Sequence, residues 1–178
     1  MDVPQVSALL STSPTAFPNC CLALSLPLLD HLASLLPKTP EFTLSVGSGP
    51  GLLEALITHR YPDFSIEGVE VNSSVNFYIP EQDINVVSGT WDLASRASQA
   101  KAWMFVYPRE PKLISKYIET YGDRDLPGIG IILWLGPRVD WADYEGCFRD
   151  SVFSQLSFPE DIGLAPYEML AVAGKESS

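Results

Sequence analysis

The chain has 178 residues, of which 46% are hydrophobic and 19% are charged, and its formal net charge is −11. This length and composition are typical of one globular domain with a sizeable core, and they exclude an intrinsically disordered chain. The acidic balance, with basic residues scattered along the sequence, argues against a nucleic-acid-binding surface, which needs clustered lysine and arginine.

The cysteines do not indicate a metal site. Cys20, Cys21 and Cys147 have no CxxC spacing, and the sequence holds only two histidines. An odd number of cysteines in this arrangement favours free thiols in a reducing compartment. We therefore expect no metal ion and a cytoplasmic location.

The apolar run "CCLALSLPLL" (residues 20–29) predicts neither a signal peptide nor a membrane span. No positive charge precedes it, because the first basic residue is Lys38. The run is also shorter than the roughly 20 residues that cross a bilayer. We expect no membrane partner.

The first 40 residues are predicted to form a separate segment. Residues 1–24 are expected to be irregular, because prolines interrupt them repeatedly, and residues 25–36 are expected to be a helix with Ser25 as its N-cap. Since residues 1–40 carry few ionisable side chains, we expect them to pack on something, either as a lid or as a dimer contact.

Residues 41–178 are predicted to form an α/β domain in which strands and helices alternate. Apolar runs predict strands at residues 42–46, 64–71, from 84, 102–107, 128–136, 151–158 and 167–175. Helical spacing predicts helices at residues 51–60, 110–122 and 141–148. This alternation indicates a largely parallel sheet with helices on both faces, which is a three-layer, Rossmann-like sandwich.

The turn after the first strand of this domain, "GSGPG", carries Gly47, Gly49 and Gly51. Glycine permits a positive φ and close approach of the backbone to a ligand, and amides at a helix N-terminus favour a polar acceptor. A dinucleotide fingerprint would need its third glycine at position 52, which is Leu52. The turn therefore favours a nucleoside ligand other than a dinucleotide.

An acidic residue, Glu70, closes the second strand, "SIEGVEV". A carboxylate at the tip of this strand can accept hydrogen bonds from the hydroxyls of a ribose. The glycine turn and Glu70, in this order, together indicate nucleoside binding.

The stretches "LSVGSGPG", "GVEVN" and "VVSGTWD" resemble the motifs of class I S-adenosylmethionine (SAM)-dependent methyltransferases. The resemblance covers about residues 41–175. It implies a mostly parallel seven-stranded sheet with an antiparallel last strand, and SAM as the cofactor. Many members of this family carry an acid two residues before the first glycine, where this chain has Ser45.

The resemblance also implies the residues that contact the cofactor. The backbone of the glycine turn would surround the methionine end and the ribose, and Glu70 would accept from the ribose hydroxyls. Two short segments, one after each of the second and third strands, would lie beside the adenine. The implied cofactor-binding residues are Gly47, Ser48, Gly49, Gly51, Glu70, Val71, Asn72, Thr90 and Trp91.

Two residues after the fourth strand, Tyr107 and Arg109, would face the methyl group and the substrate. Tyr107 is a candidate catalytic tyrosine or an ordinary strand-end aromatic. Arg109 is a candidate for pairing with a substrate carboxylate, or it pairs with an acid on the protein surface.

The sequence therefore predicts a small SAM-dependent methyltransferase acting on a small-molecule substrate. An alternative is a catalytically inactive protein of the same fold that serves as a partner or regulatory subunit, and a homodimer is compatible with either function. A nucleotide-dependent oxidoreductase is a third hypothesis, disfavoured by Leu52.

Overall fold

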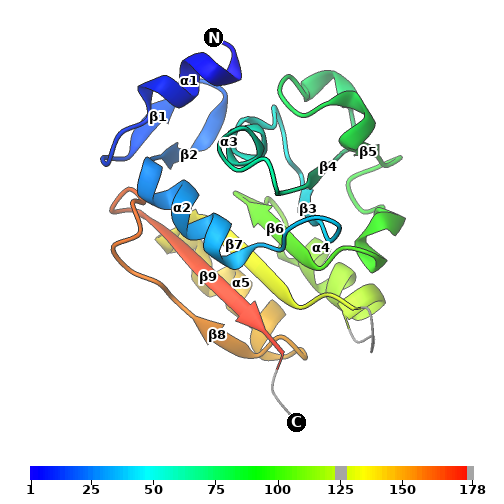
Figure 1. The fold of residues 1–178 in the computed structure, drawn as a ribbon. Helices are drawn as coiled ribbons and strands as arrows, with labels where there is room; N and C mark the ends of the chain where they lie inside the picture. Colours follow the sequence, from blue (N-terminus) through cyan, green and yellow to red (C-terminus); the bar gives the residue numbers. More distant parts are fainter. Residues whose placement is uncertain (123–127, 176–178) are drawn as a thin grey trace.

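A computed structural model of the chain describes residues 1–122 and 128–175 (Figure 1). Its central sheet has seven strands in the order β5-β4-β3-β6-β7-β9-β8. The strands are β3 (Thr43–Val46), β4 (Ile66–Glu70), β5 (Ile84–Val86), β6 (Ala102–Val106), β7 (Ile131–Pro137), β8 (Gln155–Ser157) and β9 (Glu168–Gly174). Paired strands run parallel except that β9 is antiparallel to both β7 and β8. This arrangement confirms the predicted fold class, including the antiparallel last strand.

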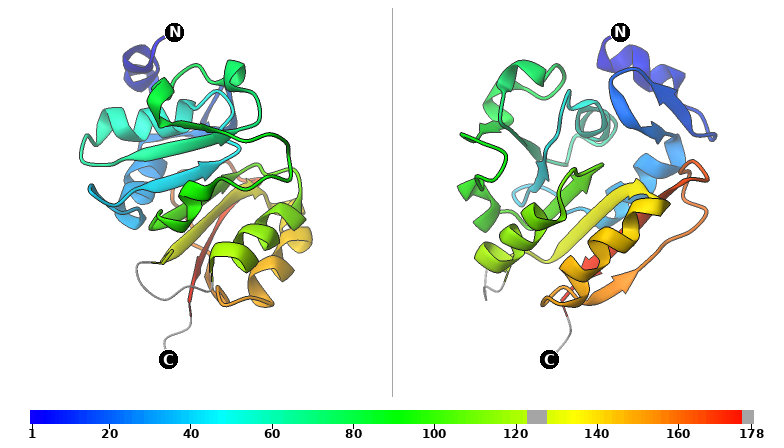
Figure 2. Two further views of the ribbon diagram at one scale, coloured as in Figure 1. Left: turned by 90° about the vertical axis from the view of Figure 1, so that its right-hand side faces the viewer. Right: turned by 180° about the vertical axis from the view of Figure 1, so that it is seen from behind.

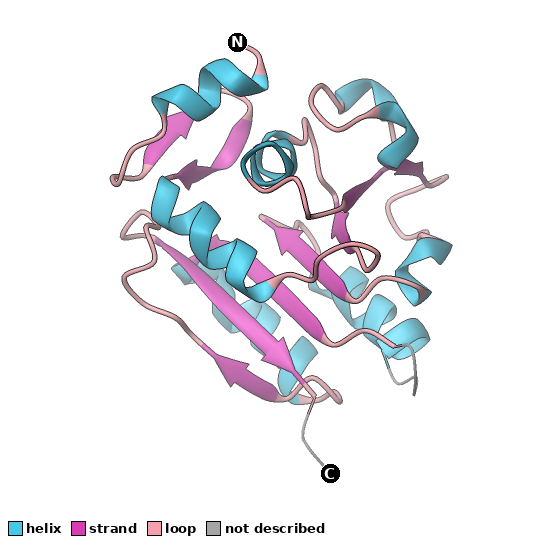
Figure 3. Ribbon diagram, viewed as in Figure 1, coloured by secondary structure: helices cyan, strands magenta, loops and turns pink. Residues whose placement is uncertain are grey.

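Helices cover both faces of the sheet, as Figures 2 and 3 show. The α-helices of this domain are α2 (Leu26–Leu35), α3 (Leu52–Arg60), α4 (Pro111–Tyr117) and α5 (Trp141–Arg149). Shorter helical turns are η1 (Ser73–Val75), η2 (Glu81–Asp83), η3 (Ser95–Ser98), η4 (Ile118–Gly122), which continues α4 as a π-helical turn, and η5 (Arg138–Asp140). In the described part of the chain, no helix has the length and apolar character needed to cross a membrane.

Strand β6 shows why its sequence is continuously apolar. Ala102 and Met104 face the core beneath α2 and α3, whereas Trp103 and Phe105 face the core beneath α4 and α5. A strand between two helical layers is buried on both faces, so its residues do not alternate with polar ones. Of the predicted domain 41–178, residues 123–127 and 176–178 lie outside the described residues.

The expectation that residues 1–24 are irregular is wrong. They form helix α1 (Val3–Leu9) and a hairpin of β1 (Thr15–Phe17) and β2 (Cys20–Leu24). The side chain of Asp2 accepts from the Gln5 amide while the Gln5 side chain accepts from the Asp2 amide, which is a capping box. The prolines that suggested irregular structure lie in the first helical turn and beside the strands, where proline is tolerated.

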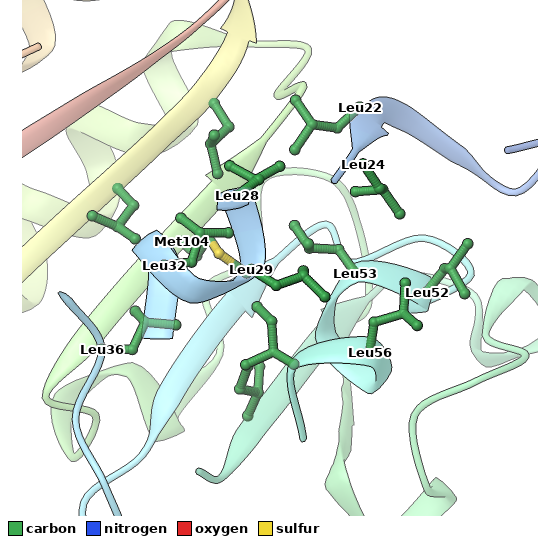
Figure 4. Close-up of a cluster of buried hydrophobic side chains, with 14 of the residues drawn as sticks. Leu22, Leu24, Leu28, Leu29, Leu32, Leu36, Leu52, Leu53, Leu56 and Met104 are labelled. Atoms are coloured by element: carbon green, nitrogen blue, oxygen red, sulfur yellow. The ribbon is translucent and has the colours of Figure 1, made fainter. Parts of the chain in front are cut away.

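The N-terminal segment packs on its own domain. Its buried apolar residues join those of α2 and α3 in one cluster, which includes Val6, Leu10, Phe17, Leu22, Leu24, Leu28, Leu29, Leu32, Leu52, Leu53 and Leu56. Figure 4 shows the leucines of β2, α2 and α3 in this cluster. This contact within the chain accounts for the scarcity of charge in residues 1–40. Helix α2 begins as predicted, since the Ser25 side chain accepts from the Leu28 amide at 3.2 Å.

The turn between β3 and α3 depends on its glycines. Gly47, Gly49 and Gly51 have φ values of +72°, +57° and +82°, which are in the left-handed region that disfavours other residues. Gly51 is the N-cap of α3, and a Cβ atom there would lie 2.6 Å from Ile79 Cγ1. Both backbone strain and contact therefore require glycine at position 51.

We expect Gly51→Ala to lower the free energy of unfolding by about 1–3 kcal/mol, because alanine would be strained in this conformation and would displace Ile79. Urea denaturation followed by circular dichroism measures the change. Gly174→Ala is the matched control, since a Cβ atom at Gly174 meets nothing within 4 Å. Equal losses of stability in the two variants would contradict this account of the turn.

Candidate functional site

A cavity of about 660 Å³ lies at the carboxyl ends of β3, β4 and β6. From β3 the chain proceeds to β4 on one side, while β6 pairs with β3 on the other side. Such a reversal of strand order is where open α/β sheets bind ligands. The β1–β2 hairpin contributes residues 18–21, which are its turn and the start of β2, to the cavity wall. The volume is within the range of about 300–1,000 Å³ typical of small-molecule sites.

The glycine turn forms one wall of the cavity through Gly47, Ser48 and Gly49. The amides of Gly47 and Ser48 donate to the Val69 carbonyl at 2.9 and 3.3 Å, and the Gly51 amide donates to the Ser48 carbonyl at 3.1 Å. These amides, expected to face a ligand, are therefore paired within the protein.

A ligand can approach the backbone of the turn closely, because the glycines have no side chains. Cβ atoms built at Gly47 and Gly49 meet nothing within 4 Å, so the backbone there borders open space. Side chains at these positions would occupy that space. Gly51, the last glycine of the turn, starts α3 and is not among the described residues that line the cavity.

Glu70 faces the glycine turn from the tip of β4. Its Oε1 accepts from the Gly49 amide at 2.5 Å, which links the two predicted parts of the site directly. Within the described residues, no hydrogen bond is found to Glu70 Oε2. Val71 and Asn72 follow on the same wall, and the Asn72 side chain caps η1 by accepting from the Ser74 amide at 3.0 Å.

The loop after β5 reaches the cavity through Thr90 and Asp92. Trp91 lies between them, but it is not among the described lining residues, and its side chain is 45% exposed. Its carbonyl accepts from Lys116 Nζ at 2.6 Å. Of the adenine-side residues that the resemblance implies, Trp91 is the one that the structure places away from the cavity.

Tyr107 and Arg109 both line the cavity after β6. Tyr107 has a φ of +48°, and its hydroxyl donates to Glu168 Oε2 at 2.5 Å. Burial and the Glu168 carboxylate raise the pKa of Tyr107 well above its usual value, so the phenol stays protonated at neutral pH. Tyr107 is therefore not equipped to remove a proton, whereas Arg109 is exposed and free to approach a ligand.

Glu168, which sequence reasoning missed, joins three elements at the edge of the site. It lies fully buried at the start of β9, and it accepts from the Ala23 amide of β2 at 3.2 Å as well as from Tyr107. It thereby holds the β1–β2 hairpin next to the tip of β6. No local sequence pattern marks this acid, because both partners are distant in the sequence.

A second residue that sequence reasoning missed is Glu54, in the first turn of α3. It lines the cavity, is 3% exposed, and its Oε2 has no hydrogen-bond partner. Burial raises the pKa of Glu54 to about 7, an effect that a nearby Ser45 hydroxyl reduces in part. Burial and the nearby Glu54 raise the pKa of the Cys20 thiol to about 12. The sequence signal that could have identified Glu54 is the position of an acid within the apolar run "GLLEAL".

The described residues hold no group of three or more His, Cys, Asp or Glu side chains that is arranged to bind a metal ion. The cavity is instead lined by backbone, apolar side chains and single polar groups.

Comparison with protein-family models finds no match, and no curated protein matches the sequence. Solved structures do match. Precorrin-6y C5,15-methyltransferase from Geobacter metallireducens superposes with a TM-score of 0.58 at 12% identity, covering 93% of this chain and 94% of that one. Human methyltransferase-like protein 13, in complex with SAH, matches with a TM-score of 0.58 at 16% identity, covering 86% and 79%.

Human N-acetylserotonin methyltransferase, in complex with SAM, matches with a TM-score of 0.56 at 15% identity and 85% coverage of this chain. This chain spans about half of that protein and of the SAM-dependent methyltransferase SibL, at 51% of each. These similarities establish the fold of class I SAM-dependent methyltransferases over most of the chain. The resemblance carried by the glycine turn and Glu70 is thus confirmed for the fold.

We expect Tyr107→Phe to lower the free energy of unfolding by about 1–3 kcal/mol, because it leaves the buried Glu168 carboxylate with an unpaired oxygen. Chemical denaturation measures the loss. Tyr167→Phe is the matched control, since the Tyr167 side chain is 61% exposed and should tolerate the change. A Tyr107→Phe protein as stable as the control would refute this anchoring contact.

We expect Glu54→Gln to stabilise the unliganded protein at alkaline pH. A carboxyl whose pKa rises from 4.5 to about 7 on folding holds a proton that the unfolded chain releases. Stability of the native protein therefore falls as the pH rises through this window. At pH 8 the variant should exceed the native protein by on the order of 3 kcal/mol, and the difference should vanish near pH 4. Urea denaturation of both proteins between pH 4 and pH 8 measures the difference in their free energies of unfolding. A difference that does not change with pH would contradict the prediction.

Proposed function

We propose that this chain, whose fold is that of class I SAM-dependent methyltransferases, binds SAM in the cavity and transfers its methyl group to a small molecule. The observation that carries the proposal is that Glu70 and the bare backbone of Gly47 and Gly49, with open space beside it, line the same cavity. A carboxylate and bare backbone at the carboxyl ends of neighbouring strands are what a nucleoside with an amino-acid tail requires.

The residues present fit such a cofactor. The open space beside Gly47 and Gly49 admits a ligand against the backbone, and Glu70 Oε2 is available to accept from ribose hydroxyls. Val71 and Val87 give an apolar wall on the adenine side. The cofactor would supply the electrophilic methyl group, and the protein would align the reactants and exclude water.

The shape of the cavity supports a small substrate. The turn formed by residues 18–21 covers it on the side of the N-terminal hairpin, and residues 107–110 line it after β6. Arg109 is exposed there and can pair with a carboxylate of the substrate in a bidentate manner. Because the Tyr107 hydroxyl is committed to Glu168, a nucleophile that is already deprotonated suits this site best.

One observation favours the alternative, a protein of this fold that acts as a partner or regulatory subunit. The amides of the glycine turn are paired without a ligand, and Glu70 uses one of its oxygens on the Gly49 amide. The turn and the acid can therefore satisfy each other with the cavity unused. Measurement of binding and of transfer separates the two functions.

We expect SAM to bind the native protein in titration calorimetry and Glu70→Ala to weaken binding about 10-fold or more, because a ribose would lose a charged acceptor. Gly49→Arg should abolish binding by filling the space beside the turn. Glu81→Ala, an exposed acid on η2, is the control and should bind as the native protein does. Circular dichroism confirms that each variant is folded.

Transfer is then measured with SAM labelled on its methyl group and a small-molecule extract. Formation of labelled products by the native protein, and less of them by Glu70→Ala, would support the methyltransferase function. Binding of SAM without transfer to any compound would support the function as a partner subunit. Heat with a nicotinamide dinucleotide and none with SAM would overturn both in favour of the oxidoreductase.

A further inference from the structure

Glu54 is a buried acid that forms no ion pair with the residues that the structure describes. Glu54 is among the residues that line the cavity, the residue is 3% exposed, and one buried oxygen of its carboxylate, Oε2, has no hydrogen-bond partner among the described residues. Burying a carboxylate without a partner is costly, so such a group is neutralised by a proton or by a cation from outside. Because Glu54 lines the cavity, a ligand bound there is the outside source from which a neutralising cation could come.

Among residues 1–122 and 128–175, no cationic side chain pairs with Glu54. Besides burial, the groups that act on it are its own backbone amide, the Ser45 hydroxyl of β3 and the Glu70 carboxylate of β4, and the Cys20 thiol of β2 responds to its charge. Helices α1 and α2, which also pack against α3, bring apolar side chains to the shared core. Every neighbouring polar group is thus neutral or acidic.

The cavity as a whole is also acidic. Of the described residues that line it, Arg109 is positively charged, and the acids are Glu54, Glu70, Asp92 and Glu110. An acidic, partly enclosed site raises the local concentration of cationic ligands. Glu54 differs from the other acids because it is buried within the first turn of α3, directly behind the glycine turn.

We propose that Glu54 is an anionic subsite that pairs with the ammonium group at the amino-acid end of the bound cofactor. This inference rests on the proposed function. It also gives meaning to Ser45, which stands where many proteins with this glycine turn carry an acid. The Ser45 hydroxyl lies next to the Glu54 carboxylate, so a residue of the following helix brings the negative charge to the place that Ser45 leaves uncharged.

The proposal predicts an effect that depends on the ligand. S-adenosylhomocysteine carries the ammonium group, whereas 5′-methylthioadenosine keeps the adenosine and thioether but lacks the amino-acid end. Glu54→Gln should weaken S-adenosylhomocysteine binding about 10- to 100-fold, as expected for loss of a charge-assisted hydrogen bond, and leave 5′-methylthioadenosine binding unchanged. Titration calorimetry with both ligands measures the four dissociation constants.

Glu41→Gln is the matched control, because Glu41 is an exposed acid two residues before β3, at the end of the strand opposite the cavity. This variant removes the same charge from the molecule and should bind both ligands as the native protein does. It separates an effect of Glu54 from an effect of net charge.

A second measurement detects the protons that Glu54 should release when the ligand binds. Since Glu54 is partly protonated near neutral pH, pairing with an ammonium group should release protons when S-adenosylhomocysteine binds. Calorimetry at pH 7 in two buffers with different ionisation enthalpies measures this release in the native protein. Glu54→Gln should reduce the release, and 5′-methylthioadenosine should cause less of it.

The outcomes separate this inference from the proposed function. If neither ligand binds the native protein, the proposed function fails and this inference with it. If both ligands bind the native protein, and Glu54→Gln either weakens the binding of both equally or leaves the binding of both unchanged, the proposed function stands and the assignment of Glu54 is wrong. Selective loss of S-adenosylhomocysteine binding together with reduced proton release supports it.

Discussion

The site depends on one constraint, the left-handed backbone of the turn between β3 and α3. Three glycines with positive φ let the chain reverse closely enough for the Gly47 and Ser48 amides to bond the Val69 carbonyl and for the Gly49 amide to bond Glu70. These contacts lock the turn to the tip of β4. They also set the direction of α3, and with it the position of Glu54 on the cavity wall. A bulkier residue in the turn would alter the fold and the site together.

The two buried acids of the site are stabilised in opposite ways. Glu168 accepts two hydrogen bonds from the protein, so it serves the fold by joining β2, β6 and β9. Glu54 lacks a partner on one oxygen, and burial raises its pKa to about 7, so it lowers the stability of the unliganded protein at neutral pH and above. Proteins commonly retain such unfavourable groups where a ligand supplies the missing interaction. Burial alone therefore does not tell the role of an acid, whereas its hydrogen-bond partners do.

Local signals in the sequence predicted most of the fold. The Ser25 cap, the glycine turn and the apolar strands each act over a few residues, and the elements they predicted are present. The prediction of an irregular segment at residues 1–24 is wrong because proline does not always interrupt secondary structure. In this segment one proline lies in the first turn of α1, and others flank strand β1. Glu168 could not be predicted, because its partner Ala23 lies 145 residues away along the chain. Burial of Glu54 likewise follows from how α3 packs against β2 and β4, which the sequence of α3 alone does not determine.

The position of Glu168 has a consequence for how the molecule is made. The hairpin at residues 15–24 emerges from the ribosome early, but its hydrogen bond to Glu168 forms only after β9 has been synthesised and has inserted between β7 and β8. Contacts between such distant parts of a chain form late, because a long loop must close before they are gained. The contact that holds the hairpin beside Tyr107 therefore forms late, and a nascent chain that stops short of β9 lacks the acid that makes it.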